Sequence, residues 1–97
     1  MSNFFKIQIK SGMNRQELLR EFKTVLHPYT IEKEKLENID ERTNLLKDLH
    51  INSANIIDIV IDAEVNYKIE IDNDSVEKMI TVGSCLDVIM KKMNDSR

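Results

Sequence analysis

Ser53, His50 and the carboxylates that follow them are the residues of this 97-residue chain whose types could together do chemistry. A serine, a histidine and an acid can form a catalytic triad, but no nucleophile-turn or oxyanion-hole motif accompanies them here. The single cysteine, Cys85, falls on the apolar face of a predicted helix, where a thiol behaves as a small hydrophobic side chain. We therefore do not expect an enzyme, and Ser53 needs another explanation.

Residues 72–75, with the sequence DNDS, resemble the start of a calcium-binding loop. Val76 then occupies a position that needs an oxygen ligand, and Glu77 stands where the tight turn needs glycine. A single cysteine also excludes a disulfide framework and a cysteine-based zinc site with four ligands. We expect no metal site beyond incidental, weak cation binding.

Length and composition narrow the class of protein. The chain carries a formal net charge of −3, with only two glycines and one proline. Its length fits one small domain, and the scarcity of turn residues argues against an all-β fold. The charge leaves no global basic footprint for nucleic acid. No apolar run approaches the roughly 20 residues that span a bilayer, and no signal peptide is recognisable. Together with the lone cysteine, this predicts a cytoplasmic protein.

The first predicted helix begins near Asn14, which has the spacing of a capping pair with Glu17. It ends at His27-Pro28, because the residue before a proline is pushed out of the helical region. From Tyr29 to Thr43 the chain is charged, which predicts a long loop with room for a helical turn. The widely spaced apolar anchors of this loop are Ile31, Leu36 and Ile39.

Residues 52–67 fit two patterns. Alternating β-branched residues between positions 57 and 65 are typical of a strand. At 3.6 residues per turn, the same segment has an apolar stripe flanked by Ile57 and a polar face opposite it. A pattern of about fifteen residues is long for a strand, and Asn52 or Ser53 can cap a helix, which favours the helix. The stripe is Ile56, Val60, Ala63 and Tyr67, and the polar face is Asn55, Asp58, Asp62 and Asn66.

The remainder predicts a short connection at 68–73, anchored by Ile69 and Ile71, and a brief helix capped by Asp74-Ser75 and ending at Met79. Thr81 then caps the last helix. Its residues at helical spacing are Val82, Cys85, Leu86, Ile89, Met90 and Met93. The whole predicts an all-α, four-helix bundle with three main helices, one short helix and a long loop after the first helix. We expect the domain at residues 13–93, with a weakly ordered or extended tail at 1–12 and a C-terminal tail at 94–97.

Four short motifs follow one another between residues 43 and 90. They are LLKDL at 45–49, NSA at 52–54, YKIEI at 67–71 and TVG at 81–83. In order and spacing they resemble the phosphopantetheine-binding region of acyl carrier proteins, which commonly show F-x-x-D-L-G, D-S-L, an aromatic followed by x-I-x-I, and T-V. The resemblance covers about half of the chain closely and implies a small four-helix carrier fold.

The resemblance implies that Ser53 carries 4′-phosphopantetheine through a phosphodiester, with an acyl group held as a thioester on the terminal thiol. A serine at the start of a helix suits this role, because unpaired backbone N–H groups and the helix dipole there favour a phosphate. The implied partners are a phosphopantetheinyl transferase, an acyl-activating ligase or acyltransferase, and a ketosynthase or another acyl-using enzyme, with the carrier as a monomer. The implied partner-binding positions are Asn52, Ala54, Asn55, Ile57, Asp58, Ile61 and Asp62.

Three positions depart from the family pattern. Asn52 replaces the usual aspartate before the serine, Ala54 replaces the usual leucine after it, and His50 replaces the glycine of the preceding turn. Asn52 still caps a helix, so the fold is not affected. The enzyme that attaches the arm commonly recognises the lost carboxylate and leucine. The chain is therefore predicted to need a dedicated transferase, or to serve a specialised pathway.

The negative charge is concentrated after Ser53. Residues 55–77 hold seven acidic side chains and one basic side chain, whereas residues 1–50 hold eight acidic and nine basic ones. Such asymmetry steers encounters with basic protein surfaces, although acidic helix faces are also common as plain solvated faces. An unmodified interaction module that docks through the acidic helix is the alternative. A helical DNA-binding domain is a third class, but it would need a basic recognition helix.

Overall fold

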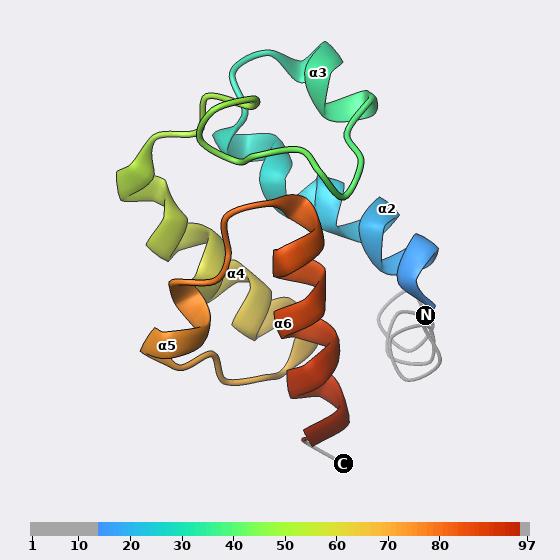
Figure 1. Cartoon of the computed structure of the whole chain (residues 1–97), viewed down its shortest axis with the longest axis vertical. Coiled ribbons are helices and arrows are strands. Elements are labelled where there is room, and N and C mark those ends of the chain that lie inside the picture. Colours follow the sequence, from blue (N-terminus) through green and yellow to red (C-terminus); the bar gives the residue numbers. More distant parts are fainter. Residues whose placement is uncertain (1–13, 96–97) are drawn as a thin grey trace.

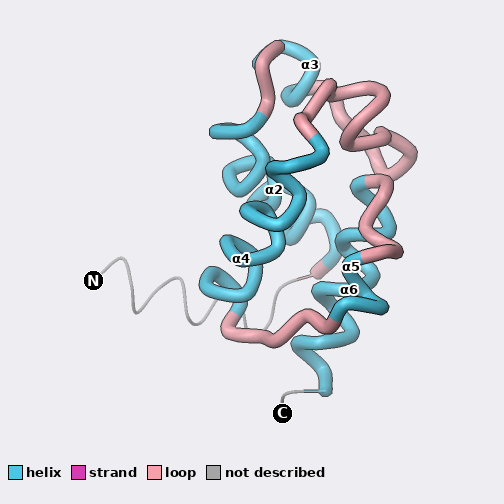
Figure 2. The backbone as a smooth tube through the Cα atoms, turned by 90° about the vertical axis from the view of Figure 1, so that its left-hand side faces the viewer, coloured by secondary structure: helices cyan, strands magenta, loops and turns pink. Residues whose placement is uncertain are grey.

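The structure, a computed structural model, describes residues 14–95, which form helices and loops without a strand. Figure 1 shows the long helices packed against one another, with the loop of residues 38–52 across one end of the bundle. Figure 2 likewise shows residues 14–95 only as helix and loop. The predicted all-α architecture is confirmed. The long helices are α2 (Arg15–Leu26), α4 (Ile56–Tyr67) and α6 (Val82–Asp95), joined through the short helices α3 (Lys33–Glu37) and α5 (Asn73–Val76) and the 3-10 turns η1 (His27–Tyr29) and η2 (Ser53–Asn55).

The predicted start and end of α2 are confirmed. The Asn14 side chain accepts from the Glu17 backbone N–H at 2.9 Å, and the Glu17 carboxylate accepts from the Asn14 N–H at 3.1 Å, which completes a capping box. The helix ends at Leu26 and passes into η1, which contains Pro28. The tail predicted at residues 1–12 lies outside the described residues.

The predicted loop between Tyr29 and Thr43 contains α3 as its helical turn. Leu36 and Ile39 are buried, as expected of anchors, but the prediction for Ile31 was wrong because 78% of this residue is exposed. Ile31 lies in the bend between η1 and α3, where no helix covers it. It is therefore part of the surface and not of the core.

The loop of residues 38–52 is held from both sides. Its apolar residues Leu45, Leu49 and Ile51 are buried in the core. The first N–H groups of α6 donate to its backbone, from Val82 to the Thr43 carbonyl at 2.8 Å and from Gly83 to the Glu41 carbonyl at 2.9 Å. These bonds satisfy the first two of the donors that a helix start leaves without partners, so the loop is fixed to the beginning of α6.

Residues 56–67 are the helix α4, which settles the choice between strand and helix. The buried face of α4 is rotated slightly about the helix axis from its predicted position. Val60, Ala63 and Tyr67 are buried as expected, but Ile59 is buried too, whereas Ile57, the predicted flank, is 56% exposed. Ile59 faces inward because α4 packs against both α2 and α6. Two neighbouring helices bury a wider face of α4 than the single predicted row of residues.

The C-terminal elements follow the prediction with three differences, the first being that α5 ends at Val76 and not at the predicted Met79. Asp72, and not the predicted Asp74-Ser75, caps α5, since its side chain accepts from the Ser75 N–H at 3.2 Å. Thr81 caps α6 as predicted, accepting from the Ser84 N–H at 3.1 Å. This helix continues through Asp95, so residues 94 and 95 are helical and not a tail. Within residues 14–95 no helix is both long and apolar enough to cross a membrane.

Cys85 lies inside the bundle, as predicted. It is fully buried, and burial raises the pKa of its thiol to about 12. The thiolate is the reactive form of cysteine, so this side chain acts as a small hydrophobic group in the core. Within residues 14–95 no three histidine, cysteine or acidic side chains lie close enough together to hold a metal ion.

Candidate functional site

Ser53 is the first residue of η2, the turn that leads directly into α4. Ile51 is buried just before it, and Asn52 adopts an extended backbone that starts the turn. The Asn52 side chain accepts from the Ala54 N–H at 2.8 Å, and the Asn52 carbonyl accepts from the Asn55 N–H at 2.8 Å. The cap is therefore supplied by Asn52, which leaves the Ser53 hydroxyl with no hydrogen-bond role in the turn.

The Ser53 side chain is exposed, and no hydrogen bond involves its hydroxyl within residues 14–95. A large substituent on this oxygen would extend into solvent without displacing a neighbour. The start of the helical segment 53–67 also supplies backbone donors and the positive end of a helix dipole. The position therefore fits a phosphodiester-linked arm such as 4′-phosphopantetheine.

The outward face of α4 carries a row of exposed apolar side chains, which we term the α4 ridge: Ile57, Ile61 and Val65. They are 56%, 50% and 71% exposed, and their spacing of four residues places them on one face. Ile57 and Ile61 were predicted as partner-binding positions. Val65 was missed, although the same spacing continues to it. Aliphatic side chains aligned in this way on a helix surface are typical of a protein-binding site.

The acids beside the α4 ridge are not equivalent. Asp58 is exposed, and no salt bridge or side-chain hydrogen bond of its carboxylate occurs among the described residues. Asp62 is half-buried and accepts from the Tyr29 hydroxyl at 2.6 Å. This hydrogen bond, together with burial and the negative charges of Asp62 and Asp58, raises the pKa of Tyr29 to about 12. Asp62 is therefore positioned by η1, whereas Asp58 is available to a partner.

Two more acids of the segment 55–77 are engaged within the fold. The Glu64 carboxylate accepts from the Ile71 N–H at 2.8 Å, which holds the connection after α4. Asp72 pairs with Lys92 of α6 at 2.8 Å, and this hydrogen bond, with that from Ser75, holds the pKa of Asp72 well below its usual range. The acidic surface is thus smaller than the sequence indicated. Its exposed members outside these contacts are Asp58, Glu70, Asp74 and Glu77.

A cleft of about 600 Å³, which we term the serine cleft, opens beside Ser53. Asn52 and Asn55, which flank the serine, form one wall, and the segment from η1 to α3 forms the other. Sequence reasoning missed this cleft, because two segments far apart in the chain, residues 28–33 and 50–55, contribute to it. Its lining includes Tyr29, Ile31, Lys33, His50, Asn52 and Asn55.

Ala54 and Asn55 are the remaining predicted positions around Ser53. Ala54 is exposed next to Ser53, and Asn55 is half-buried at the end of η2. All seven predicted partner-binding positions therefore lie on η2 and α4 or immediately before them. His50, where the family commonly has glycine, has a φ of 55°, in the left-handed region. Glycine adopts that conformation without strain, which explains the family preference at this turn.

Comparisons with known proteins identify the fold and the family. No protein-family model matches the chain. It is 33% identical over 80 residues to the acyl carrier protein of Tropheryma whipplei, covering 81% of this chain and 94% of that protein. It is 29% identical over 84 residues to the acyl carrier protein of Thermotoga maritima, covering 82% of this chain and 96% of that one. The crystal structure of an acyl carrier protein from Thermotoga maritima matches with a TM-score of 0.72 at 26% identity, covering 88% of this chain and 96% of that chain. These matches confirm the family that the sequence predicted, and the chain belongs to the acyl carrier protein family.

Proposed function

We propose that this chain carries an acyl group, or a related carboxylic intermediate, as a thioester on 4′-phosphopantetheine attached to Ser53. The observation that carries the proposal is the exposed, uncommitted hydroxyl of Ser53 at the start of the helical segment 53–67. The phosphodiester forms when this oxygen attacks the β-phosphorus atom of coenzyme A and releases adenosine 3′,5′-bisphosphate. The protein then presents the cargo and does no chemistry of its own.

The partner surface in this proposal is η2 with the outer face of α4. Ile57 and Ile61 of the α4 ridge supply apolar contact, and Asp58 supplies an exposed carboxylate for the basic side chains of a partner. Asp62 contributes as a carboxylate already fixed by Tyr29. The partners are a phosphopantetheinyl transferase, a ligase or acyltransferase that loads the arm, and a ketosynthase or similar enzyme that uses the cargo. Fatty-acid, polyketide or other secondary-metabolite synthesis in the cytoplasm would employ such a monomeric carrier.

The residues next to Ser53 bear on which transferase modifies it. Asn52 performs the capping role with its amide oxygen, so the turn keeps its geometry without the carboxylate that family members commonly have. Ala54 is exposed and offers a transferase far less apolar surface than a leucine would. Both changes remove recognition groups while the fold around the serine is kept. This supports modification by a dedicated transferase.

Mass spectrometry tests the attachment. The full chain is incubated with coenzyme A and a promiscuous phosphopantetheinyl transferase, and protein from the native host is measured in parallel. We expect the mass of one phosphopantetheine arm on Ser53, lost in Ser53→Ala and kept in Ser75→Ala, a matched serine on α5. Absence of the arm from both the treated and the native protein would overturn the carrier function.

The second candidate function is an unmodified interaction module. It is favoured by the α4 ridge and Asp58, which form a docking surface whether or not Ser53 is modified. Complementation of the native host separates the two functions. Loss of function in a folded Ser53→Ala variant supports the carrier, whereas full function of that variant supports docking alone.

A further inference from the structure

Ile31 has the most exposed of the large aliphatic side chains in residues 14–95, at 78%. Its neighbour Thr30 is only 1% exposed, and the Thr30 hydroxyl donates to the Leu26 carbonyl at 2.8 Å. Tyr29, one residue earlier, donates to Asp62 of α4 at 2.6 Å. Ile31 therefore projects from a bend whose preceding residues are fixed to both α2 and α4.

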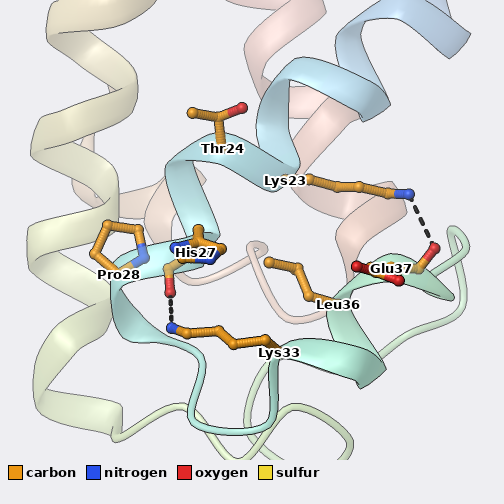
Figure 3. A pocket seen from close by; sticks show the side chains of 7 residues that line it. All are labelled: Lys23, Thr24, His27, Pro28, Lys33, Leu36 and Glu37. Carbon is orange, nitrogen blue, oxygen red and sulfur yellow. Dashed lines mark hydrogen bonds between the residues drawn. The ribbon is translucent and has the colours of Figure 1, made fainter.

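The segment that follows Ile31 is fixed as well. Lys33 donates to the His27 carbonyl, which ties the start of α3 to η1. Near the other end of α3, Lys23 of α2 donates to the Glu37 carbonyl at 3.1 Å. Figure 3 shows both lysines reaching across the cleft between α2 and α3. Because the backbone is held on both sides, a partner that binds Ile31 loses little conformational entropy in ordering it.

Ile31 lies across the serine cleft from the turn that carries Ser53. It lines one wall of this cleft, and Asn52 and Asn55 of that turn line the other. Ile57, the first residue of the α4 ridge, follows Ser53 by four positions and is 56% exposed. Ser53 therefore has an exposed aliphatic side chain across the cleft and another along its own helical segment. A partner that covers the serine can contact both.

The charges on the two sides have opposite signs. On α4, the exposed Asp58 carboxylate has no ion pair among the described residues. The lining of the serine cleft includes the basic residues Lys33 and His50, and no acidic residue of the described chain belongs to it. The acid in the bend itself, Glu32, is paired with Lys35 at 2.8 Å. A complementary partner is basic where it faces α4, and acidic around an apolar pocket where it faces the bend.

The partners in the proposed function differ in how much of this surface they cover. The Ser53 oxygen itself enters the active site of the transferase, because it attacks the phosphorus atom there. The transferase therefore covers the serine together with both neighbouring walls. An enzyme that uses the loaded arm receives the thioester at the far end of a long flexible chain, so its active site does not enclose the serine. Recognition across the serine cleft thus fits the transferase.

Resting on the proposed function, we propose that Ile31 is a recognition residue for the phosphopantetheinyl transferase, which binds it in an apolar pocket bordered by acidic side chains. Ala54 offers little apolar surface directly after the serine, and Ile31 supplies such surface from the opposite wall of the cleft. Lys33 and His50 face the acidic border. The specificity of a dedicated transferase then depends on two segments, η2 with α4 and the bend at residues 29–33.

A competition assay tests this inference. Equal amounts of full-length wild type and Ile31→Ser are mixed with coenzyme A and an extract of the native host, and mass spectrometry resolves the two modified chains by their difference in mass. The early ratio of the two products equals the ratio of their kcat/KM values. We expect Ile31→Ser to be modified about 10- to 100-fold more slowly, because burial of one isoleucine side chain at an interface has an effect of that size.

Ile80→Ser is the matched control, because Ile80 is also an exposed isoleucine, at 54%, and does not line the serine cleft. In its own competition with wild type it should be modified equally fast. A promiscuous transferase in place of the extract should modify all three chains at similar rates, which would show that Ser53 remains accessible in each. Equal slowing of Ile31→Ser with both enzyme sources would overturn the inference, because Ile31 would then act on the turn and not on recognition.

A pair of charged substitutions at the same position tests the acidic border. Ile31→Lys and Ile31→Glu both remove the aliphatic side chain, but only the lysine is attracted by acidic groups of the partner. In competition with each other in the host extract, Ile31→Lys should be modified faster. The opposite order would contradict the acidic border.

The same assay separates this inference from the carrier function. If the extract modifies wild type and Ile31→Ser equally fast, Ser53 still carries the arm and Ile31 is not a recognition residue. If only the promiscuous enzyme modifies the wild type, the inference is again overturned, while Ser53 is still shown to accept the arm. If neither enzyme source modifies the wild type, the carrier function itself fails and the inference fails with it.

Discussion

The loop of residues 38–52 and the outer face of α4 are both mixtures of aliphatic and charged residues, but the fold uses them in opposite ways. In the loop, Leu45, Leu49 and Ile51 are buried. On α4, the ridge of Ile57, Ile61 and Val65 remains exposed. The loop, though irregular, contributes to the core, whereas the regular helix keeps these aliphatic side chains on the surface.

The polar residues of the loop form hydrogen bonds within the fold, whereas Asp58 on the outer face of α4 does not. In the loop, the Asn44 side chain accepts from the N–H groups of Leu46 and Lys47 at 2.9 Å, and Asp48 accepts from the Asn44 N–H at 2.8 Å. On α4, Asp58 has no such commitment among the described residues. Local hydrogen bonding therefore distinguishes a charge that builds the fold from one that is available for binding.

The strongest way to break this contrast is to truncate one aliphatic side chain in each region. Leu49→Ala removes a side chain that is 1% exposed and is expected to lower the free energy of unfolding by about 2–5 kcal/mol. Ile57→Ala is expected to change it by no more than about 0.5 kcal/mol, because the side chain is already largely in water. Urea unfolding of both variants measures the difference. Equal losses would mean that the α4 ridge is part of the core.

The junction of the loop with α6 gives the next largest effect. A Cβ atom at Gly83 would lie 2.9 Å from the Glu41 carbonyl oxygen, closer than Cβ atoms are found in proteins, and 3.0 Å from the Glu41 Cβ, which is a tight contact. Gly83→Ala is therefore expected to destabilise by about 1–3 kcal/mol, although alanine alone would favour the helix. Lys91→Ala, at an exposed position of the same helix, is the control. A more stable Gly83→Ala protein in the same unfolding experiment would show that the loop is not fixed against α6.

Much of this contrast could be predicted from the sequence, and its failures have physical reasons. The capping box of Asn14, the proline end of α2 and the cap at Thr81 depend on neighbours in the chain, so local patterns suffice. The burial of Ile59 in place of Ile57 depends on where α2 and α6 contact α4, which periodicity does not specify. Helix α3 has no side-chain cap and a single buried residue, Leu36, so its sequence looks like a charged loop.

The candidate site also has one part that local sequence motifs predict and another part that they do not. Ser53 and the positions on α4 follow from short motifs within one segment. The hydrogen bond between Tyr29 and Asp62 joins residues 33 apart in the chain, and the serine cleft combines two segments that are distant in the sequence. Such contacts arise only when the bundle assembles, because no local spacing encodes them.

Lowering the pH tests which carboxylates stabilise the fold and which do not. Arg15 of α2 donates from Nε and Nη2 to the Glu41 carboxylate at 2.7 and 2.8 Å, and this interaction lowers the pKa of Glu41. A lowered pKa in the folded state stabilises the protein above the ordinary value of 4.5, and that contribution is lost as pH falls through the folded-state value. The pairing of Asp72 with Lys92 acts in the same direction.

We therefore expect the free energy of unfolding to fall between about pH 5 and about pH 3, and to fall less steeply in Glu41→Gln. Urea unfolding across this range measures the slope. Glu37→Gln, at an exposed carboxylate outside these ion pairs, should leave the slope unchanged. An identical slope in wild type and Glu41→Gln would show that the Arg15 pair contributes nothing measurable, as is common for exposed ion pairs.

The smallest expected effect lies at His50, where the structural loop meets the site. A non-glycine residue in the left-handed region costs about 1–2 kcal/mol, whereas glycine avoids this strain but loses more backbone entropy on folding. His50→Gly should therefore stabilise the protein by a net of about 0–1 kcal/mol. Lys68→Gly, with a φ of 57° at the end of α4, should behave alike, because the same balance applies there. If urea unfolding instead shows a loss confined to His50→Gly, the imidazole itself stabilises the turn before Ser53. His50 would then belong to the residues that stabilise the fold, and the candidate binding surface would begin only at Ser53.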